Sequence, residues 1–379
     1  MRDMRRVDVL VVGAGLAGLH TARLLARRDL DVLVIDRRRS PDSGIRTTGI
    51  FVRRTLDDFD LPEHLLGPGI RDVLLYPPSR RSPVRLTSDR DEYRVADMPG
   101  VYRYARRAAE AAGAEVLPGV RYVGARSGVV TLEGAEPVAA RFVVGADGAR
   151  SHVARDLGLD VNRRFLVGAE LVHPIAPGTD GPAFHCVLDP RVAPGYLGWV
   201  VDDGRQAHVG VAGDPGAMRA GVRHLLDAFL ADGAPGHAPT AGPVERRGGP
   251  IPVGGVLRRL ACPAGLLVGD AAGAVSPLTA GGLDPCLRLS ELAAAVVAGY
   301  LRSGDQEVLR RYDGGALRAR FRGRLLLRRA LGGVRTAAAA EAAVGLLRGR
   351  AGRAVAARVL FGDGSFPDVR AGLADLAAT

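Results

Sequence analysis

The stretch VDVLVVGAGLAGLHTARLLARRDLDVLVID, residues 7–36, decides the fold. It opens with an apolar run rich in β-branched residues, residues 7–12, which predicts a buried strand. The run ends in GAGLAG, residues 13–18, and apolar residues at helical spacing follow. A second apolar run, residues 31–35, predicts another strand and ends at Asp36. Strand, glycine turn, helix, strand and acid in this order are typical of dinucleotide binding.

Each glycine of this motif has a physical role. Gly13 permits the tight turn, Gly15 lets the backbone approach a pyrophosphate, and Gly18 allows the helix to pack closely on the sheet. The N-terminus of the helix then faces the phosphate charge. Asp36 lies 23 residues after Gly13 and would accept hydrogen bonds from an adenosine ribose. These four residues, with the adjacent Arg37, are the predicted nucleotide-binding set.

Two later segments again end an apolar strand with aspartate and glycine. One leads into GADG, residues 145–148, and the other into GDAAG, residues 269–273. Ligands of open α/β sheets bind beyond the carboxyl ends of the strands, so Asp147, Gly148 and Asp270 are expected at the same crevice. Asp270 can bond the hydroxyls of a linear ribityl chain, which favours FAD over NAD.

A glycine-rich segment follows, SPLTAGG at residues 276–282. It leads into a predicted helix with Asp284 as the N-cap and Pro285 in the first turn. The amides near Gly281 and Gly282 would point at an anion in front of them. A reduced flavin carries its negative charge along one edge of its ring, so these amides are expected to face it.

Together these motifs resemble those of the group A flavoproteins, the p-hydroxybenzoate hydroxylase-like enzymes. GDAAGAVSPLTAGGL, residues 269–283, most resembles the geranylgeranyl reductase branch. The resemblance covers almost the whole chain and implies an α/β fold: a Rossmann-like FAD-binding domain with an inserted mixed-sheet substrate domain and C-terminal helices. It implies FAD as cofactor and NAD(P)H as transient electron donor. To the residues above it adds further FAD-binding positions: Arg46, Gly273, Pro277 and Leu283.

The chain departs from the family pattern in two places. An Arg-x-x-Phe-Asp signature usually precedes the helix that ends here near residue 113, but this chain has Met98, Val101 and Tyr102 at its conserved positions. Reductases of this branch also carry Tyr-x-Trp-x-Phe-Pro in the substrate domain.

Here the corresponding tyrosine and tryptophan, Tyr196 and Trp199, are one residue further apart, and Val-Asp replaces Phe-Pro. One residue of offset sends a strand side chain to the opposite face, so only part of that substrate wall is expected. Tyr196, Trp199 and His185 are the predicted substrate-pocket residues. His185 and the adjacent Cys186 are also candidates for the proton donor, although packing roles compete, and no catalytic residue is assigned.

The domain boundaries follow from the alternation of these patterns. Short strands punctuated by Pro and Gly alternate in the segments expected to bind substrate, and a helical pattern fills the C-terminal part. The predicted FAD-binding domain comprises residues 1–74, 97–159 and 259–304, the substrate-binding domain residues 75–96 and 160–258, and the helical region residues 305–379. No second GxGxxG follows a strand, so NAD(P)H is expected to dock transiently over the flavin.

Composition excludes several classes of protein. The chain has 379 residues, 47% hydrophobic and 25% charged, as expected for one large or two intertwined globular domains rather than a disordered or fibrous chain. Its three cysteines have no zinc or disulfide spacing, so no metal is predicted and a reducing cytoplasm is favoured. No apolar run reaches the roughly 20 residues of a membrane span. The apolar run at residues 7–19 follows arginines, as in a signal peptide, but no small-residue cleavage site follows it. Its nucleotide-binding pattern explains the run better, so export is not expected.

The net charge of +11 is concentrated near the C-terminus. Residues 302–358 contain fourteen arginines and four acidic residues. Such a surface can be a solvated helix pair, an anionic-membrane contact or a nucleic-acid site. No base-stacking pattern of aromatic residues accompanies the arginines, which disfavours nucleic acid. Solvated helices are favoured, and peripheral membrane contact remains the alternative.

The predicted function is NAD(P)H-driven reduction of a C=C bond in a hydrophobic, isoprenoid- or quinone-like substrate. Reduced flavin would deliver hydride and an acid would supply a proton. The alternative on the same fold is a flavin-dependent monooxygenase that hydroxylates an aromatic or polyketide-like metabolite. A non-catalytic flavin- or nucleic-acid-binding protein is a third class, supported only by the basic C-terminal stretch.

Overall fold

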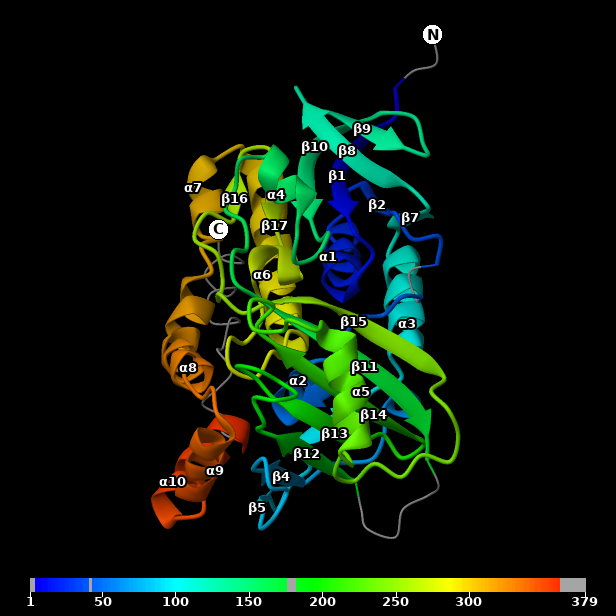
Figure 1. Ribbon diagram of the computed structural model, residues 1–379. Coiled ribbons are helices and arrows are strands. Elements are labelled where there is room, and N and C mark those ends of the chain that lie inside the picture. The colour runs from blue at the N-terminus through cyan, green and yellow to red at the C-terminus, as the bar shows by residue number, and fades with distance from the viewer. Residues whose placement is uncertain (1–3, 41–42, 176–181, 362–379) are drawn as a thin grey trace.

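Two β-sheets build two bodies that stack on one another, with the C-terminal helices along one side (Figure 1). The computed structural model describes residues 4–40, 43–175 and 182–361. The predicted fold class is confirmed: a Rossmann-like sheet, a separate mixed sheet and C-terminal helices. The last part of the predicted helical region, residues 362–379, lies outside the described residues.

The first sheet is built around the strand that the glycine motif follows. Its main path runs β16-β17-β10-β1-β2-β7, and β9 and β8 extend it beside β10. The strands are β1 (Arg6–Val12), β2 (Val32–Asp36), β7 (Glu115–Pro118), β8 (Arg121–Arg126), β9 (Val129–Glu133), β10 (Val138–Gly145), β16 (Ala261–Cys262) and β17 (Gly265–Leu267). β1 pairs in parallel with β2 and β10, and β10 in parallel with β17. The motifs that follow these strands therefore meet at one edge.

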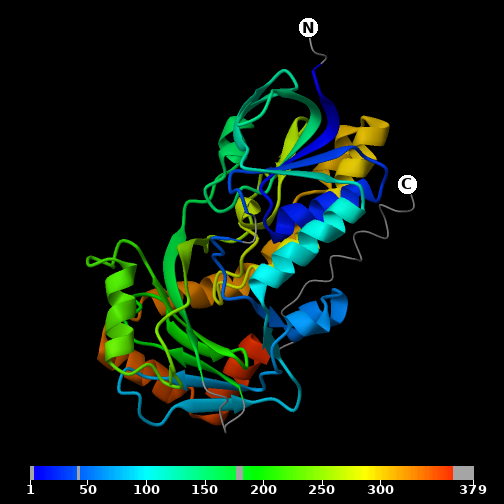
Figure 2. The same cartoon turned by 90° about the vertical axis from the view of Figure 1, so that its right-hand side faces the viewer.

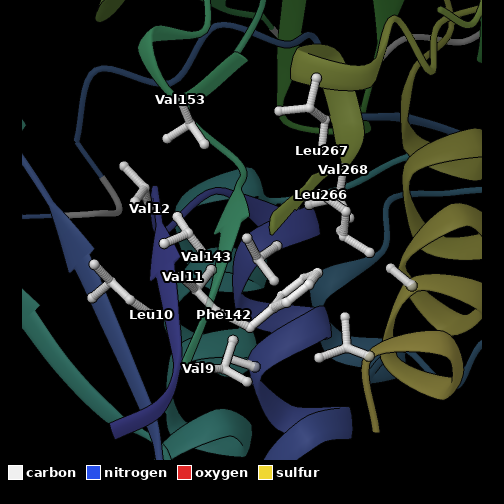
Figure 3. Packing of buried hydrophobic residues seen from close by; sticks show 14 of the residues in the cluster. Val9, Leu10, Val11, Val12, Phe142, Val143, Val153, Leu266, Leu267 and Val268 are labelled. Carbon is white, nitrogen blue, oxygen red and sulfur yellow. The ribbon is translucent and has the colours of Figure 1, made fainter. Parts of the chain in front are cut away.

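Helices cover this sheet and complete the first core. They are α1 (Leu16–Ala26), α3 (Met98–Ala111), α4 (His152–Asp156) and α6 (Leu283–Ser303), with a short 3₁₀ turn η2 (Gly269–Ala272). α1 packs against both α3 and α6, and the three lie side by side in Figure 2. Figure 3 shows the core, where Val9, Phe142 and Leu266 from three strands pack together. Strands buried on both faces explain the continuous apolar runs.

The second sheet has the order β15-β11-β14-β13-β12-β4-β5. Its strands are β4 (Asp72–Tyr76), β5 (Val84–Thr87), β11 (Phe165–Pro174), β12 (Ala183–Val187), β13 (Gly198–Asp202), β14 (Gln206–Gly213) and β15 (Glu245–Pro252). The β12–β4 pair is parallel and the other pairs are antiparallel, so the sheet is mixed. Helix α5 (Val222–Ala231) covers one face and buries Leu226 and Phe229 against it.

Three features of this second body differ from the sequence predictions. β4 begins at Asp72, so the predicted boundary at residue 74 cuts a strand. β6 (Tyr93–Val95) pairs with β3 (Ile50–Val52) in a small separate sheet instead of joining the substrate sheet. α5 lies in a segment that was predicted as strands. Alternation of apolar residues predicts a strand but does not identify its exact start or the strand with which it pairs, which explains the first two differences.

The short helices α2 (Arg53–Asp58) and η1 (Glu63–Leu65) connect the two bodies, and the C-terminal helices join them from outside. These are α7 (Gln306–Arg310), α8 (Gly315–Gly332), α9 (Ala337–Leu346) and α10 (Arg350–Phe361). Tyr312 donates a hydrogen bond to the Leu267 carbonyl of the first sheet at 2.6 Å. Val344 and Ala356 pack on Val84 of β5 in the second sheet. Among the described residues, no helix is long and apolar enough to cross a membrane.

Replacing Gly18 by alanine should destabilise the protein. A Cβ at this position would lie 2.0 Å from the Gly13 carbonyl oxygen and 3.0 Å from the Ala146 Cβ, which leaves little room for adjustment. We expect a loss of about 1–3 kcal/mol in the free energy of unfolding, measured in urea, as for other overpacked sites. Gly323→Ala, in α8, is the control: its Cβ would meet nothing within 4 Å. That variant should gain about 0.5–1 kcal/mol from helix propensity. Equal stabilities would contradict the close-packing role of Gly18.

Candidate functional site

A cavity of about 960 Å³ runs between the two bodies. At one end it is lined by the carboxyl ends of β1 and β2, where the glycine motif and Asp36 lie. At the other end it is lined by the face of the second sheet opposite α5 and by α8. The cavity therefore brings together the motif-bearing edge of the first sheet and the predicted substrate sheet.

The nucleotide end is open where a phosphate would need space. Gly15 is the N-cap of α1, and a Cβ there would meet no atom within 4 Å. Asp36 accepts hydrogen bonds from the Ala14 amide at 2.8 Å and from the Arg38 amide at 2.8 Å, and the Arg38 guanidinium pairs with it at 3.0 Å. Burial works to raise the pKa of Asp36, but these donors outweigh burial and lower it. Asp36 is thus held as a carboxylate.

Asp270 lines the cavity and lies far along the chain from the glycine motif but close to it in space. A Cβ on the preceding Gly269 would lie 2.8 Å from the Ala17 side chain of α1, and one on Gly282 would lie 3.5 Å from Asp270 Oδ1. Burial raises the pKa of Asp270 to about 6, and the positive charge of Arg46 opposes that rise. No hydrogen bond from a described residue reaches this carboxylate, so it can accept hydroxyl donors from a ligand.

The residues present fit FAD. The cavity is lined by an open glycine at a helix N-terminus, by the Asp270 carboxylate, which can accept hydrogen bonds from hydroxyl groups, and by a second helix N-terminus at Gly282. Most of the predicted FAD-binding residues line it: Gly13, Gly15, Asp36, Arg37, Arg46, Asp147, Gly148, Asp270, Gly281, Gly282 and Leu283. Their contacts with FAD stay a prediction. No group of three or more His, Cys, Asp or Glu side chains within the described ranges could hold a metal ion.

Other predicted FAD-binding residues shape the fold instead of lining the cavity. Gly18 packs α1 on the sheet, and Gly273 adopts a left-handed conformation where a Cβ would lie 2.6 Å from the Gly255 carbonyl oxygen. Pro277 is close to the same Gly255. Asp147 lines the cavity, but its Oδ2 accepts hydrogen bonds from the first two amides of α4, those of His152 at 2.6 Å and Val153 at 3.2 Å.

The predicted N-cap of α6 was wrong by two residues. The helix begins at Leu283 with Gly282 as N-cap, while Pro285 stays in its first turn. The Asp284 carboxylate instead accepts a hydrogen bond from Thr55 at 2.9 Å and from Arg288 at 2.9 Å. A buried arginine on the same helix face attracts this carboxylate more strongly than the helix amides do.

The substrate end has an aromatic and aliphatic wall. Tyr196 and Trp199 line the cavity, but His185 does not. Strand side chains alternate between faces, so Phe184 faces the cavity and His185 faces the other way, where its Nδ1 lies 3.0 Å from the Tyr76 hydroxyl. The structure therefore separates His185 from the predicted substrate wall. Burial raises the pKa of Cys186 to about 12, so this thiol stays neutral.

Two arginines of α8 reach the cavity region from the basic stretch. Arg324 lines the cavity, and its guanidinium donates to Ser276 Oγ at 2.7 Å, in the segment before α6. Arg328 donates to the Gly195 carbonyl at 2.6 Å and stacks over the Tyr196 ring at 5.2 Å. Part of the basic stretch thus supports the cavity.

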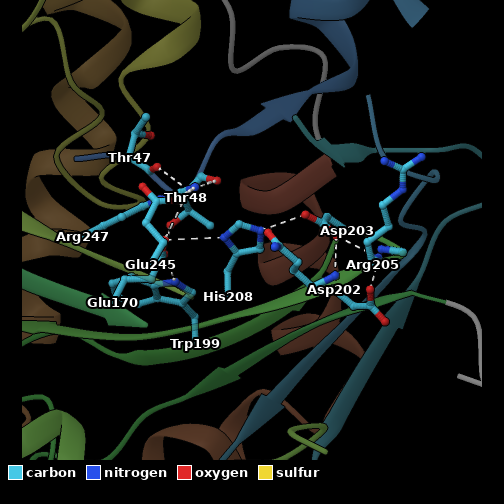
Figure 4. A network of polar contacts seen from close by, with 12 residues as sticks. Thr47, Thr48, Glu170, Trp199, Asp202, Asp203, Arg205, His208, Glu245 and Arg247 are labelled. Carbon is cyan, nitrogen blue, oxygen red and sulfur yellow. Dashed lines mark hydrogen bonds and ion pairs between the residues drawn. The ribbon is translucent and has the colours of Figure 1, made fainter. Parts of the chain in front are cut away.

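The sequence analysis missed a buried polar network on the cavity face of the second sheet (Figure 4). Glu170 of β11 accepts a hydrogen bond from Trp199 Nε1 at 3.0 Å and another from the Thr48 hydroxyl. Arg247 of β15 lies 3.6 Å from Glu170 and donates to the Thr47 carbonyl at 3.0 Å. The available signal was a single charged residue inside an apolar strand, as in FLVGAELV, residues 165–172.

Comparison with known proteins agrees with this geometry. The FAD binding domain family model matches residues 6–167. Digeranylgeranylglycerophospholipid reductase 1 of Methanopyrus kandleri is 30% identical over 325 residues, covering 81% of this chain and 84% of that protein. The chain belongs to the geranylgeranyl reductase family. It is an FAD-dependent oxidoreductase. The digeranylgeranylglycerophospholipid reductase of Methanocaldococcus jannaschii is 28% identical, covering 83% of each chain.

Solved structures show that this oxidoreductase shares its fold more widely. A geranylgeranyl bacteriochlorophyll reductase-like protein of Thermoplasma acidophilum matches with a TM-score of 0.82 at 22% identity, covering 99% of this chain and 100% of that one. A probable FAD-dependent monooxygenase of Pseudomonas aeruginosa matches with a TM-score of 0.64 at 19% identity, covering 98% and 100%. The fold is therefore common to reductases and monooxygenases.

Asp270→Asn should stabilise the FAD-free oxidoreductase and weaken its binding of FAD. The folded pKa of about 6 lies above the unfolded value of 3.8, so the folded state favours the neutral form of Asp270. The free energy of unfolding therefore falls as the pH rises from about 4 to about 6 and Asp270 ionises. Removing the charge should raise the free energy of unfolding at pH 7 by about 3 kcal/mol relative to the wild type, and by little at pH 4.

Urea unfolding at both pH values, with titration of FAD fluorescence, checks this prediction. Asp227→Asn, at an exposed position on α5, is the control and should change neither quantity. A variant that binds FAD as the wild type does would show that Asp270 does not contact the cofactor.

Proposed function

We propose that this oxidoreductase uses FAD to reduce a C=C bond in a hydrophobic, isoprenoid- or quinone-like substrate, with NAD(P)H as electron donor. The observation that carries the proposal is the continuity of the cavity. The space beside Asp270 and Gly282 passes without interruption into a chamber with apolar walls. A flavin in the first part would therefore present its ring to a hydrocarbon in the second.

The chamber suits a long apolar chain. Its walls come from the second sheet, the loop before β13, β6, α8 and α10, and are formed by Tyr93, Phe184, Tyr196, Leu197, Trp199, Ile251, Phe321, Val359 and Leu360. Burying apolar surface contributes about 25 cal/mol per Å², so an isoprenoid would gain substantially from this wall. The relatives from Methanopyrus kandleri and Methanocaldococcus jannaschii are digeranylgeranylglycerophospholipid reductases, which supports an isoprenoid substrate.

The chain's own groups would position the cofactor. The α1 N-terminus and Gly15 would hold the pyrophosphate, Asp36 the ribose and Asp270 the ribityl hydroxyls. The amides at the α6 N-terminus would face the ring edge. FAD, when bound, supplies the hydride transfer. The chamber walls exclude water from the reacting carbons.

Product mass decides between the two enzyme classes. Purified protein with FAD and NAD(P)H should convert an isoprenoid or lipid quinone to a product heavier by two hydrogen atoms, at a rate independent of oxygen. A monooxygenase would consume oxygen and add one oxygen atom to the product. Oxygen-dependent turnover with that gain in mass would overturn the reductase proposal.

We also infer that the C-terminal helices contact an anionic membrane surface, from which a lipid would reach the chamber. Large apolar side chains are exposed on these helices, with Leu326 63% and Leu346 78% accessible, beside Leu327 and Val355. Basic residues surround them, and α8 and α10 also form the chamber wall. Exposed apolar groups among arginines are typical of peripheral membrane binding.

Replacing Leu326 and Leu346 together by glutamine should weaken binding to vesicles that contain anionic lipid by at least about tenfold, because two apolar anchors are lost. Vesicle sedimentation at low and high salt measures the effect, and binding by the wild type should fall with salt. Val244→Gln is the control, since Val244 is 60% exposed but lies just before β15. Equal binding by the double variant, or no binding by the wild type, would leave these helices as a solvated surface.

A further inference from the structure

Three ionisable side chains of the second sheet form a continuous chain of contacts (Figure 4). His208 of β14 is at its centre, with a side chain that is 2% exposed. Its Nε2 lies 3.1 Å from Asp203 Oδ2, and its Nδ1 lies 3.5 Å from Glu170 Oε1. Each ring nitrogen therefore faces a different carboxylate.

The two ends of this chain lie in different surroundings. Asp203, in the turn between β13 and β14, keeps 17% of its side chain exposed to solvent. Glu170 is 4% exposed and lines the cavity with Thr48 and Trp199. The chain thus begins at a carboxylate that water can reach and ends at the cavity wall.

The fold alone does not require this arrangement. Arg247 already neutralises the Glu170 carboxylate at 3.6 Å and binds the Thr47–Thr48 backbone. Burying a further ion pair costs desolvation free energy, and a protein with apolar residues of similar size in its place is often at least as stable. Glu170 Oε1 and His208 Nδ1 lie 3.5 Å apart, and neither makes a well-aligned hydrogen bond to the other or to any other described residue. They face each other, as a donor and an acceptor of one proton would.

We propose that Asp203, His208 and Glu170 conduct the proton that C=C reduction consumes, with Glu170 as the group that delivers it into the cavity. This role rests on the proposed function, because only that reaction requires a proton there. Asp203 and His208 act through Glu170, so they are positioning and relay residues.

The transfer adds one hydride and one proton across the C=C bond. Reduced FAD, when bound, would supply the hydride, two electrons and one proton, to one alkene carbon. His208, protonated on both ring nitrogens, loses its Nδ1 proton to the Glu170 carboxylate, and the O–H bond so formed breaks as the proton goes to the other alkene carbon. The imidazole, now neutral and protonated on Nε2, turns about its Cβ–Cγ bond so that the unprotonated nitrogen faces Asp203. Asp203 then relays a proton from water to that nitrogen, which restores the protonated ring.

Three carboxylates around His208 favour a proton on its ring: Asp202 and Asp203 on the turn side and Glu170 on β11. The positive charge of Arg247 on β15 opposes it. Burial alone lowers the pKa of His208, but Asp203 and Glu170 outweigh it and raise the pKa to about 9. Burial works to raise the pKa of Glu170, and His208 and Arg247 reverse that effect. At neutral pH the stored proton therefore resides on His208, and its supply falls above about pH 9.

Glu170→Gln tests the delivery step. The amide oxygen can still accept from Trp199 and Thr48, but the side chain cannot carry a proton. We expect reduction of FAD by NAD(P)H to proceed as in the wild type, and oxidation of the reduced flavin by the alkene to slow at least tenfold. Glu245→Gln is the matched control, because Glu245 pairs with Arg247 at 2.6 Å but lies outside the chain. It should keep the wild-type rate, solvent deuterium isotope effect and pH profile.

Nitrogen-15 NMR of histidine-labelled, FAD-free protein tests the relay without turnover. His208→Asn assigns the signal among the eight histidines. The pKa of His208 should fall by at least about one unit in both Glu170→Gln and Asp203→Asn, and stay unchanged in Glu245→Gln.

The outcomes separate the two proposals. A wild type that reduces no alkene overturns the proposed function and, with it, the destination of the proton. If the wild type reduces alkenes and Glu170→Gln does so at the same rate, with the same solvent isotope effect, the relay alone is overturned. The network would then only stabilise the contact between the Thr47–Thr48 segment and the second sheet.

Discussion

The parallel pairing of β1 with β2 and β10, and of β10 with β17, is the constraint on which the rest depends. The register that joins Val12 to Gly145, and Gly145 to Leu267, ends three strands at the same level. Three glycine-containing turns from distant parts of the chain therefore open onto one crevice. The burial of these strands on both faces fixes that level, since a slip would expose apolar side chains. Gly13 and Gly18 allow the turn after β1 to pack closely, because a Cβ at either position would collide with backbone oxygen.

The second sheet gives this crevice its chemical surroundings. One face is sealed by α5, so the opposite face is left to form the wall of the cavity. Most of that wall is apolar, and the polar groups within it gather around Glu170. A single body would have provided either a nucleotide site or a hydrophobic chamber. Stacking the two bodies places them next to each other, which the proposed reaction on an apolar substrate requires.

How much the sequence could predict depends on the range of the interactions. The glycine motif, Asp36 and Asp270 were predictable because each is tied to a local strand–turn pattern. The Glu170–His208 contact joins residues of two strands whose pairing appears only in the folded sheet, so no local pattern could reveal it. The same reason applies to the pairing of β6 with β3. Asp284 was misplaced because the competing Arg288 lies one helical turn away, which a capping pattern ignores.

Helix α8 contacts both halves of the site: Arg324 holds the segment before α6, and Arg328 holds the tyrosine side of the chamber. Cofactor and apolar ligand thus share one support. Thermodynamic linkage then demands reciprocity: whatever factor one occupant gains by ordering this helix, the other gains equally. Under the proposed function, scarcity of flavin would weaken binding of the apolar substrate, and abundance of that substrate would help to retain the flavin.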